Sequence, residues 1–331
     1  MPEQQIPYST EVFTGIRPTG NLTVANYIGA VEPLIGLQTE GKSPLVFVAD
    51  LHGLTDREPG EIVSYTHAVV ADYLALGVDP NRAKIFIQSE LFPMIGELSL
   101  ILSRHTSLAE LMRLPTLKDK LKGAKPETAK ALLGIYPVMM SADILLQQAD
   151  IVPVGEDQMP HIEVTRRLAR RFNSDYGDTF HIPQAHTIAP VRILSLRGEG
   201  KMSKTNPEGA IFLTDDPDVA AKKVQKATTA FAGERTDSLD SLVVLVKGLC
   251  VDEHDLQIVD DFIARHMQKE QIMGAFKKEA ARIVREFLVA FQSRRIAIRE
   301  DDVHDILLEG KTIAEKNARD TLQAVHKSLG I

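Results

Sequence analysis

A strand, a glycine-containing turn and the start of a helix follow one another within residues 11–30. Val12 suits a short buried strand that ends near Gly15, and Gly15 and Gly20 bracket a turn whose backbone can approach a ligand closely. From Thr23 onward, apolar residues recur at intervals of three and four, which predicts one buried face of a helix. This order of elements is typical of α/β proteins.

The start of this helix is a candidate anion site. Thr23 is the predicted N-cap, so the N–H groups of Val24, Ala25 and Asn26 are expected to face outward at the positive end of the helix dipole. Many α/β proteins begin a helix after a glycine-containing loop for structural reasons alone. This stretch by itself therefore does not distinguish a phosphate site from an ordinary turn.

Strand-length runs alternate with helical patterns in the first half of the chain. Residues 44–50 form a continuous apolar run, typical of a parallel strand buried on both faces, and 83–89 suit another strand, with a loop expected at 51–56. Helices are predicted at 61–77, which ends at a C-cap glycine, and at 94–112. The alternation predicts an α/β fold with a doubly wound parallel sheet, in which ligands bind beyond the carboxyl ends of the strands.

A helix, a buried acid and a strand follow in the middle of the chain. The helix at 128–147 is expected to break near Pro137. Asp143 lies among apolar residues, so it must either be paired or be ready to accept a donor, because an isolated buried charge is costly. Pairing with a neighbouring amide or arginine is the simpler explanation from the residues alone. Residues 150–158 suit a short strand and a turn into a helix that starts near Met159.

Two lysines stand three residues apart in a loop at 198–210 that is rich in glycine and proline. Ser203 and Thr205 add hydroxyl groups between and beside Lys201 and Lys204. Two flexible ammonium groups on a loop that is free to close suit the stabilisation of charge on a departing pyrophosphate. A solvated loop can also carry two lysines, although rarely in this string.

Helical patterns dominate the last third of the chain. A strand at 192–196 is expected to lead into the lysine loop, and a helix is expected to start around Asp215 and Pro217. No convincing strand follows, apart from the apolar run at 241–248. The tail after Asp301 is predicted to form one or two helices.

Composition restricts the class of protein. No apolar run reaches the ~18–20 residues that a membrane span needs, and the N-terminus lacks the basic start and apolar core of a signal peptide, so no membrane partner and a cytoplasmic location are expected. Cys250 is the one cysteine, which excludes a disulfide framework and predicts a buried thiol. None of the ten histidines has the spacing of metal ligands, so no protein metal site is expected.

The net charge of −7 argues against a protein that coats nucleic acid indiscriminately, but two basic clusters leave room for a specific nucleic-acid partner. Either cluster can also be a solvated face. The cluster in a loop is the better candidate, because a mobile loop can follow a phosphate backbone. The loop cluster comprises Lys118, Lys120, Lys122, Lys125 and Lys130, and the helical cluster comprises Arg166, Arg167, Arg170 and Arg171.

Three motifs together resemble one enzyme family. TVAN at 23–26 resembles the HIGH element, and KMSKT at 201–205 closely resembles the KMSKS loop, of the class I aminoacyl-tRNA synthetases. Residues 136–173 between them, which include MMSAD and GEDQ, are similar to the tryptophanyl-tRNA synthetases in particular. The likeness covers nearly the whole chain in the same motif order, so it is more specific than either motif alone.

The resemblance implies a reaction with L-tryptophan, ATP carrying Mg²⁺, and tRNA(Trp). The tryptophan carboxylate attacks the α-phosphorus of ATP, and the aminoacyl group then passes to the terminal adenosine of tRNA. The resemblance further implies a Rossmann-like catalytic domain at 1–214 and a helical domain that reaches the anticodon at 215–300. It also implies that C-terminal helices at 301–331 pack back on the catalytic domain, and that the protein is a homodimer.

The resemblance also assigns site residues. Asp143 is similar to the acceptor of the indole N–H, and an acceptor-only carboxylate suits a group that can only donate. Glu156 and Asp157 would lie along the adenosine, although acids in a first helical turn also stabilise the helix dipole. The catalytic set is Lys201, Lys204, Thr23 and Asn26. The ATP-binding set adds Arg17, Pro18, Thr19, Ala25, Gly155, Glu156, Asp157, Ile193, Met202, Ser203 and Thr205. The tryptophan-binding set is Asp143, Tyr136, Met140, Phe13, Gly15 and Gln158.

Two alternative functions remain open at this point. A tyrosyl-tRNA synthetase shares the architecture, but the MMSAD and GEDQ contexts favour the tryptophan enzymes. A paralogue that binds nucleotide or tRNA with weakened catalysis is suggested by Ala25, because the HIGH element has glycine at this third position. Thr23 in place of histidine and Thr205 in place of serine are milder departures.

The methyl group of Ala25 is expected to crowd the adenine and to weaken ATP binding modestly. Ala25→Gly should therefore lower the KM for ATP, measured by the exchange of labelled pyrophosphate into ATP. An unchanged or higher KM would mean that the surroundings already accommodate the methyl group.

Overall fold

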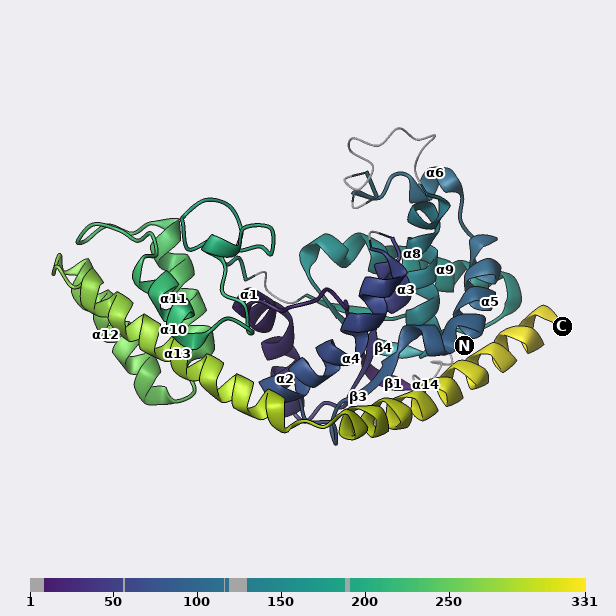
Figure 1. The fold of residues 1–331 in the computed structure, drawn as a ribbon. Helices are drawn as coiled ribbons and strands as arrows, with labels where there is room; N and C mark the ends of the chain where they lie inside the picture. The colour runs from purple at the N-terminus through teal and green to yellow at the C-terminus, as the bar shows by residue number, and fades with distance from the viewer. Residues whose placement is uncertain (1–8, 56, 116, 119–129, 188–190) are drawn as a thin grey trace.

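The computed structural model describes residues 9–331 except 56, 116, 119–129 and 188–190. A sheet lies near the middle of the molecule, and helices between Pro217 and Ala297 form one end (Figure 1). The last helix begins near the middle of the molecule and runs along the underside of the sheet-containing part (Figure 1). The chain is therefore divided into a sheet-containing part and a purely helical part, joined by the lysine loop.

All five strands of the sheet are parallel, in the order β3-β2-β1-β4-β5. The chain runs outward from β1 to β3 on one side and then crosses to β4 and β5 on the other, so the predicted doubly wound sheet is confirmed. The sequence pattern does not indicate β5, because three of its four residues are exposed. The strands are β1 (Thr10–Ile16), β2 (Pro44–Val48), β3 (Lys84–Ile87), β4 (Ala149–Val154) and β5 (Gln184–Thr187).

The sheet separates two apolar cores. Successive side chains of a strand point to opposite faces, so Val46 and Val48 of β2 join one core while Leu45 and Phe47 join the other. Burial of both faces explains why this strand is a continuous apolar run. The first core continues into the helical part through residues such as Phe276, so the two parts share one apolar core.

The helix predicted at 94–112 consists of two helices, α5 (Phe92–Ser103) and α6 (Leu108–Leu111). Ser107 begins the second helix, because its hydroxyl oxygen accepts a hydrogen bond from the N–H of Glu110 and the Glu110 carboxylate accepts from the N–H of Ser107. This local capping box interrupts a stretch whose apolar spacing is continuous.

The expected helix break near Pro137 is wrong. Helix α8 (Ala131–Leu146) continues through this proline. A proline inside a helix removes one backbone hydrogen bond, but here every residue from 136 to 146 except Met140 is buried. Helix α8 packs between α5 and α9 (Met159–Tyr176), so tertiary packing keeps the helix intact.

The helix predicted at 61–77 is α4 (Pro59–Leu76), which ends at Gly77 with a left-handed φ of 113°, as the sequence predicts. The expected loop at 51–56 differs, because its first residues belong to a single helical turn, α3 (Asp50–Gly53). This turn places a short helix directly at the carboxyl end of β2.

The first helix of the chain is not regular throughout. Helix α1 (Val24–Asn26) leads into a π-helical turn, η1 (Tyr27–Val31), and then into α2 (Glu32–Thr39). Ile28 and Val31 of the predicted face are buried, and Gly248 of the helical part packs against Ile28. The π turn therefore lies where the two parts of the molecule meet.

Four helices form the helical part. The apolar run at 241–248 is helical rather than extended, because its apolar residues recur on the face that enters the first core. Cys250 is half-buried at the end of this helix, and burial raises the pKa of its thiol to about 11. The helices are α10 (Pro217–Gln225), α11 (Asp237–Leu249), α12 (Glu253–Met267) and α13 (Met273–Ala297).

The tail forms a single helix, α14 (Glu300–Leu329), that lies against the sheet-containing part (Figure 1). Gly310 touches the backbone of β3, because a Cβ atom at this position would lie 2.0 Å from the carbonyl oxygen of Ile85. The side-chain amide of Gln147 donates to the carbonyl oxygen of Ala314 at 3.1 Å. Although α14 is 30 residues long, neither it nor any other described helix is both long and apolar enough to cross a membrane.

Gly310→Ala should lower the free energy of unfolding by about 1–3 kcal/mol, because the added methyl group would meet backbone atoms of β3 rather than a movable side chain. Gly274→Ala on α13 is the matched control, since its Cβ would enter open space, and it should be neutral or stabilise by up to about 1 kcal/mol. Chemical unfolding of both variants measures the difference. Equal effects would contradict the direct packing of α14 on β3.

Candidate active site

Four short segments each follow a strand, and two of them, the turn at 17–23 and η4, carry predicted site residues. The turn at 17–23 follows β1, α3 follows β2, the 3₁₀ turn η2 (Gln88–Leu91) follows β3 and the 3₁₀ turn η4 (Glu156–Gln158) follows β4. Parallel strands end at the same edge of a sheet, so these segments lie along one edge. The winding of the chain reverses between β1 and β4, which is where doubly wound sheets bind ligands.

The turn after β1 requires its glycines. A Cβ atom on Gly15 would lie 2.7 Å from the ring of Phe47, which itself stacks on Phe13 with ring centroids 4.9 Å apart. Gly20 has a φ of 73°, in the left-handed region that favours glycine. The predicted close approach at Gly15 is thus to an aromatic ring of the protein itself, and it packs the ends of β1 and β2 tightly together.

Thr23 caps the first helix, as the sequence predicts. Its hydroxyl oxygen accepts from the N–H of Asn26 at 3.3 Å, and Oδ1 of Asn26 accepts from the N–H of Thr23 at 3.0 Å. The expectation that the N–H groups of residues 24–26 face outward is wrong for two of them, because the N–H of Val24 donates to the carbonyl oxygen of Ile211 and that of Asn26 is used by the cap. The segment after the lysine loop therefore holds the helix start.

Backbone hydrogen bonds shape the lysine loop. The N–H of Met202 donates to the carbonyl oxygen of Ile193 at 2.9 Å, and the N–H of Ser195 donates to that of Gly200 at 3.0 Å. The strand expected at 192–196 is reduced to one isolated bridge, because its N–H groups bond within this loop and to a side chain of α11 rather than to a neighbouring strand.

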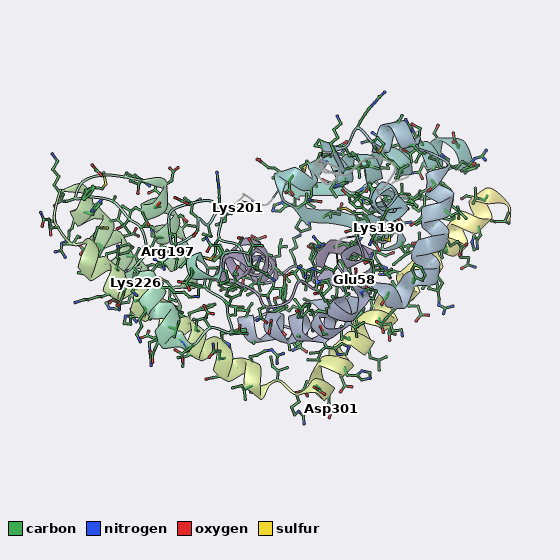
Figure 2. All side chains as sticks on the ribbon, turned by 45° about the horizontal axis from the view of Figure 1, so that its top comes forward. Glu58, Lys130, Arg197, Lys201, Lys226 and Asp301 are labelled. Carbon is green, nitrogen blue, oxygen red and sulfur yellow. The ribbon has the colours of Figure 1, made fainter. Side chains whose placement is uncertain are left out.

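The side chains of the lysine loop point in different directions. Met202 and Ile193 are buried in the first core. The hydroxyl oxygens of Ser203 and Thr205 lie 2.9 Å apart. Lys201 is exposed and lies between the helical part and the rest of the molecule in the view of Figure 2. The loop thus combines an apolar base with polar and charged groups above it.

The ammonium group of Lys204 lies on the turn after β1. Its Nζ donates to the carbonyl oxygens of Thr19, at 2.6 Å, and Gly20, at 3.1 Å, and lies 3.1 Å from the hydroxyl oxygen of Thr19. Burial lowers the pKa of Lys204 to about 8; the charge of Arg57 acts in the same direction, whereas that of Asp72 opposes it. The lysine loop is therefore in direct contact with the turn that precedes the TVAN element.

Lys223 of α10 anchors the far end of the lysine loop. Its Nζ donates to the carbonyl oxygens of Pro207, at 3.1 Å, and Ala210, at 2.9 Å, and to the carboxylate of Asp215, at 2.9 Å. Pro207 begins a 3₁₀ turn, η5 (Pro207–Gly209). The sequence pattern does not reveal this role, since Lys223 is one of two adjacent lysines in an amphipathic helix.

Asp143 is only 4% exposed and is paired within the protein. Nε2 of His52 lies 2.9 Å from its Oδ2, and Nε2 of Gln88 lies 2.8 Å and 3.0 Å from its two oxygens. Burial raises the pKa of Asp143, and the bonds from His52 and Gln88 oppose that shift. Pairing with a neighbouring amide is confirmed, and a role toward a ligand stays a prediction.

The sequence motifs alone do not identify His52 and Gln88. Gln88 follows β3 directly, and His52 lies in α3, the helical turn after β2. Their position at the carboxyl edge of the sheet is the signal that could have found them, because Asp143 reaches the same edge from α8.

Aromatic side chains surround the Asp143 pair. The His52 ring meets Tyr136 edge-on, with centroids 6.4 Å apart, and the hydroxyl group of Tyr136 lies 3.1 Å from Nε2 of His161. Phe13, Tyr136 and the half-buried Met140 belong to the second core. The structure thus brings most of the predicted tryptophan-binding side chains to one side of the sheet.

The segment after β4 presents exposed acids at the edge where the winding reverses. Glu156 and Asp157 are exposed in the first turn that leads to α9, where they also stabilise the helix dipole. A Cβ atom on Gly155 would lie 2.8 Å from Oδ1 of Asp157, and Gln158 donates to Oδ2 of Asp157 at 2.8 Å. Gln158 is therefore turned toward Asp157.

The remaining predicted ATP-binding residues lie in or beside the same turn. Arg17 is exposed and Pro18 is buried. Ala25 is half-buried, and its methyl group packs against the first core, whereas Asn26 is exposed.

The two basic clusters differ in what the structure describes. Arg171 makes two hydrogen bonds to Glu110, at 2.9 Å and 3.1 Å, and Arg166 bonds to Glu163 at 2.7 Å, so part of the arginine cluster is neutralised by acids. In the lysine cluster Lys118 and Lys130 are described, and Lys120, Lys122 and Lys125 lie outside the described residues.

Histidines pair with single acids rather than forming a ligand cluster. Nε2 of His181 lies 3.2 Å from Asp150, and Nδ1 of His105 lies 3.3 Å from Asp175. Across the part of the chain that the structure describes, no group of three or more histidine, cysteine, aspartate and glutamate side chains is arranged to hold a metal ion.

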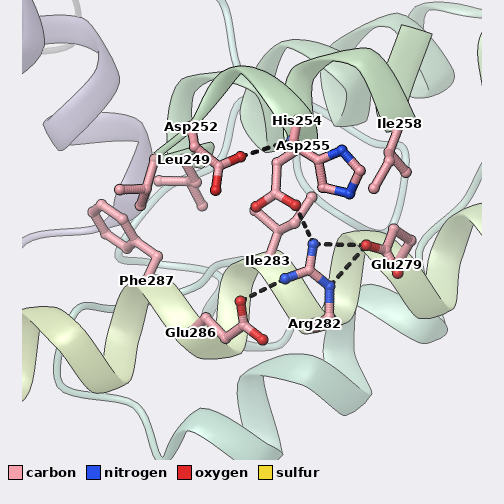
Figure 3. A pocket seen from close by; sticks show the side chains of 11 residues that line it. Leu249, Asp252, His254, Asp255, Ile258, Glu279, Arg282, Ile283, Glu286 and Phe287 are labelled. Carbon is pink, nitrogen blue, oxygen red and sulfur yellow. Dashed lines mark hydrogen bonds and ion pairs between the residues drawn. The ribbon is translucent and has the colours of Figure 1, made fainter. Parts of the chain in front are cut away.

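A pocket of about 400 Å³ lies between the end of α11, α12 and α13, and none of the predicted site residues lines it (Figure 3). Arg282 lies at its centre and pairs with several acids, and Asp252 adds another carboxylate at the rim (Figure 3). The acids would repel a triphosphate, so this pocket does not suit ATP. The partners of Arg282 are Asp255, Glu279 and Glu286.

The Lys204 ammonium group should titrate near pH 8, because burial disfavours its charge. NMR of the lysine side-chain Cε and Nζ follows this titration, and Arg57→Gln should move the midpoint to higher pH by removing a nearby positive charge. Between about pH 8 and the usual lysine range the unfolded chain holds the proton that the folded chain releases, so this group makes stability rise with pH there. A midpoint near 10.5 would contradict the buried contact with the turn.

Comparisons with known sequences agree with this arrangement. A family model described as "tRNA synthetases class I (W and Y)" matches residues 8–289. The tryptophan–tRNA ligase of Caldanaerobacter subterraneus subsp. tengcongensis is 36% identical over 334 residues, which cover 97% of this chain and 98% of that protein. The tryptophan–tRNA ligase of Helicobacter pylori is 35% identical and covers 98% of this chain and 99% of its own length.

Solved structures agree as well. The tryptophanyl-tRNA synthetase from Mycoplasma pneumoniae superposes with a TM-score of 0.83 at 30% identity, over 98% of each chain. That from Campylobacter jejuni, complexed with ADP and tryptophan, gives a TM-score of 0.82 at 28% identity, over 97% of this chain and 100% of its own. These relatives favour the tryptophan over the tyrosine enzymes, and the chain belongs to the tryptophanyl-tRNA synthetases, within the class I aminoacyl-tRNA synthetases.

Proposed function

We propose how the residues of this chain divide the ATP-dependent attachment of L-tryptophan to tRNA(Trp), the reaction of its family. ATP lies between the segment 17–26 and the lysine loop 201–205, and the indole ring of tryptophan reaches Asp143. The contact of Lys204 with Thr19 supports this placement most directly, because it joins the lysine loop to the turn before the TVAN element, at the edge of the sheet to which Asp143 is linked through His52.

In the first step, the tryptophan carboxylate attacks the α-phosphorus of ATP, and the bond to the β-phosphate oxygen breaks to release pyrophosphate. This step needs alignment and charge neutralisation rather than a protein nucleophile. Lys201, Lys204 and Arg17 would face the charge that develops on the pyrophosphate. Mg²⁺ that arrives with the nucleotide would supply further positive charge.

Thr23 and Asn26 would act both by fixing the backbone at the start of the first helix and by contact with ATP. Their reciprocal capping bonds fix the start of the first helix, so the exposed Asn26 stays beside the phosphates. Ser203 and Thr205 would add hydroxyl groups on the opposite side.

The adenosine end of ATP would lie between β4 and the lysine loop. Exposed carboxylates of Glu156 and Asp157 can accept hydrogen bonds from ribose hydroxyl groups, and Gly155 leaves room for the carboxylate of Asp157. Ile193 and Met202 are buried, so they would support the loop backbone that faces the adenine rather than cover the base from outside.

In the second step, the aminoacyl group passes to the terminal adenosine of tRNA. We assign α10–α13 to the anticodon end of the tRNA and α14 to support of the catalytic part. Lys118 and Lys130 flank the segment that we assign to the tRNA backbone, because lysines attract phosphates without reading sequence.

We also propose a homodimer formed through α5, α6 and the start of α8. These helices expose large apolar side chains, among them Leu100, which is 77% exposed, and such groups gather where a partner covers them. The other exposed apolar side chains there are Phe92, Leu108, Met112 and Ile135.

Leu100→Glu should reduce the mass in solution from two chains to one, because it would place a charge in the apolar contact. Val251→Glu is the matched control: Val251 is equally apolar and 84% exposed, but it lies beside the helical part. Sedimentation velocity measures the mass. A wild-type protein that sediments as a single chain would refute the dimer.

Asp143→Ala should lose most of the selectivity for tryptophan over phenylalanine while the fold survives. A site built to bond a substrate N–H rejects an analogue that lacks it by about 10⁴–10⁵, whereas an apolar pocket alone gives about 10²-fold. Exchange of labelled pyrophosphate into ATP, run with tryptophan, phenylalanine and tyrosine, measures this selectivity. An unchanged ratio rules out the role of Asp143, and a wild-type protein that exchanges with none of them favours the paralogue with weakened catalysis.

A further inference from the structure

Gln88 is completely buried and stands between two polar groups of different character. Its Oε1 accepts from the backbone N–H of His52 at 3.3 Å. Its Nε2 lies 2.8 Å and 3.0 Å from the two carboxylate oxygens of Asp143. A buried glutamine that meets a donor at one end and an acceptor at the other links the ends of β2 and β3 to α8.

The orientation of the Gln88 amide is fixed by its partners. The oxygen and nitrogen ends of an amide have similar shapes, so the hydrogen-bond network decides which end is which. A backbone N–H can only donate, so the oxygen of Gln88 must face His52 and its NH₂ must face Asp143. The carboxylate of Asp143 must therefore accept the hydrogen bonds from the NH₂ group of Gln88.

The backbone N–H of His52, which fixes the orientation of the Gln88 amide, is itself held in place. The carboxylate of Asp50 accepts from the N–H groups of Leu51 and Ser89, each at 2.9 Å. These bonds tie α3, which carries His52, to η2, which carries Gln88. The imidazole Nε2 of His52 adds a second contact to Asp143 at 2.9 Å.

We propose that Gln88 is a positioning residue that fixes Asp143 as a hydrogen-bond acceptor and thereby restricts the site to amino acids whose ring carries a donor at this point. A carboxylate offers about four lone-pair directions, so acceptor capacity remains for one ring N–H beyond the bonds from Gln88 and His52. The inference rests on the proposed contact of Asp143 with the indole.

Without Gln88, the buried carboxyl group would lose a donor that favours its charged form. Burial already favours the protonated form, so Asp143 would more readily carry a proton and donate. The site would then accept a ring that presents an acceptor, which the native arrangement rejects.

Two isosteres of tryptophan test this polarity in pyrophosphate exchange. In 3-benzofuranylalanine an oxygen acceptor replaces the indole N–H, and in 3-benzothienylalanine a sulfur atom replaces it. The wild-type protein should prefer tryptophan to the benzofuranyl analogue by more than about 100-fold in kcat/KM, since a site that bonds a substrate N–H leaves buried polar groups unpaired when the N–H is missing. The benzothienyl analogue should fall between them, because sulfur is only a weak acceptor.

Gln88→Met keeps the length of the side chain and removes its polar groups. The ratio of kcat/KM for tryptophan to kcat/KM for benzofuranylalanine should fall at least about tenfold. The KM for tryptophan should rise, and the KM for ATP should stay unchanged. Gln88→Glu, which keeps the shape, should lower the ratio in the same direction, because two carboxyl groups in contact share one proton and the partly neutralised Asp143 is then a weaker acceptor for the indole N–H. The second variant decides the question if the first does not fold.

Gln147→Met is the matched control. Gln147 is also a buried amide with two hydrogen-bond partners, and it is the C-cap of the helix that carries Asp143, but it faces Ala314 and Asn317 of α14. Its substitution should lower stability and leave the ratio unchanged. The positioning role of Gln88 would be overturned if a folded Gln88 variant kept the wild-type ratio, or if the ratio fell equally in Gln147→Met.

Asp143→Ala separates this inference from the proposed function. If Asp143→Ala keeps the wild-type preference for tryptophan over both isosteres, the contact between Asp143 and indole is wrong. If Asp143→Ala loses the preference and the Gln88 variants keep it, the contact stands and the role of Gln88 alone fails.

Discussion

The ammonium group of Lys204 on the carbonyl oxygens of Thr19 and Gly20 joins two segments that are 185 residues apart in the chain. One segment ends the first strand and the other begins the helical part, so this contact brings the two parts together at the edge of the sheet. Carbonyl oxygens only partly replace water around an ammonium group, which is why burial lowers the pKa of Lys204 to about 8. In the proposed ATP site a phosphate would be the better partner of this group, because it carries a full negative charge.

A second constraint is the cost of a buried carboxylate. Asp143 stays in an apolar helix because two neighbouring strand ends each supply a donor to it. The arrangement depends on the parallel sheet, which brings the ends of β2 and β3 to the same edge. A fold-level property, the common direction of the strands, thus allows a charge to be buried, and the buried charge gives the site a defined polarity.

The sequence predicts the regular elements well and their interruptions poorly. Strands at 44–50 and 83–89 and the helix that ends at Gly77 are present, because continuous apolar runs and a C-cap glycine are local signals. The break expected at Pro137 is absent, since the packing of α8 outweighs the lost hydrogen bond. The strand expected at 192–196 fails because no neighbouring strand lies beside it.

The sequence by itself determined the motif order, the α/β class, the cap at Thr23 and the candidate acid at 143, because each depends on residue type and short-range spacing. The tertiary structure alone decided which groups pair with them. His52 and Gln88 belong to no sequence motif, and their partner Asp143 lies 91 and 55 residues away in the chain. It also decided that the N–H groups at the first helix start serve the protein itself, since Val24 bonds to a segment that only folding brings near. Hydrogen bonds between distant segments form only once the chain has packed, so no short window of sequence can contain them.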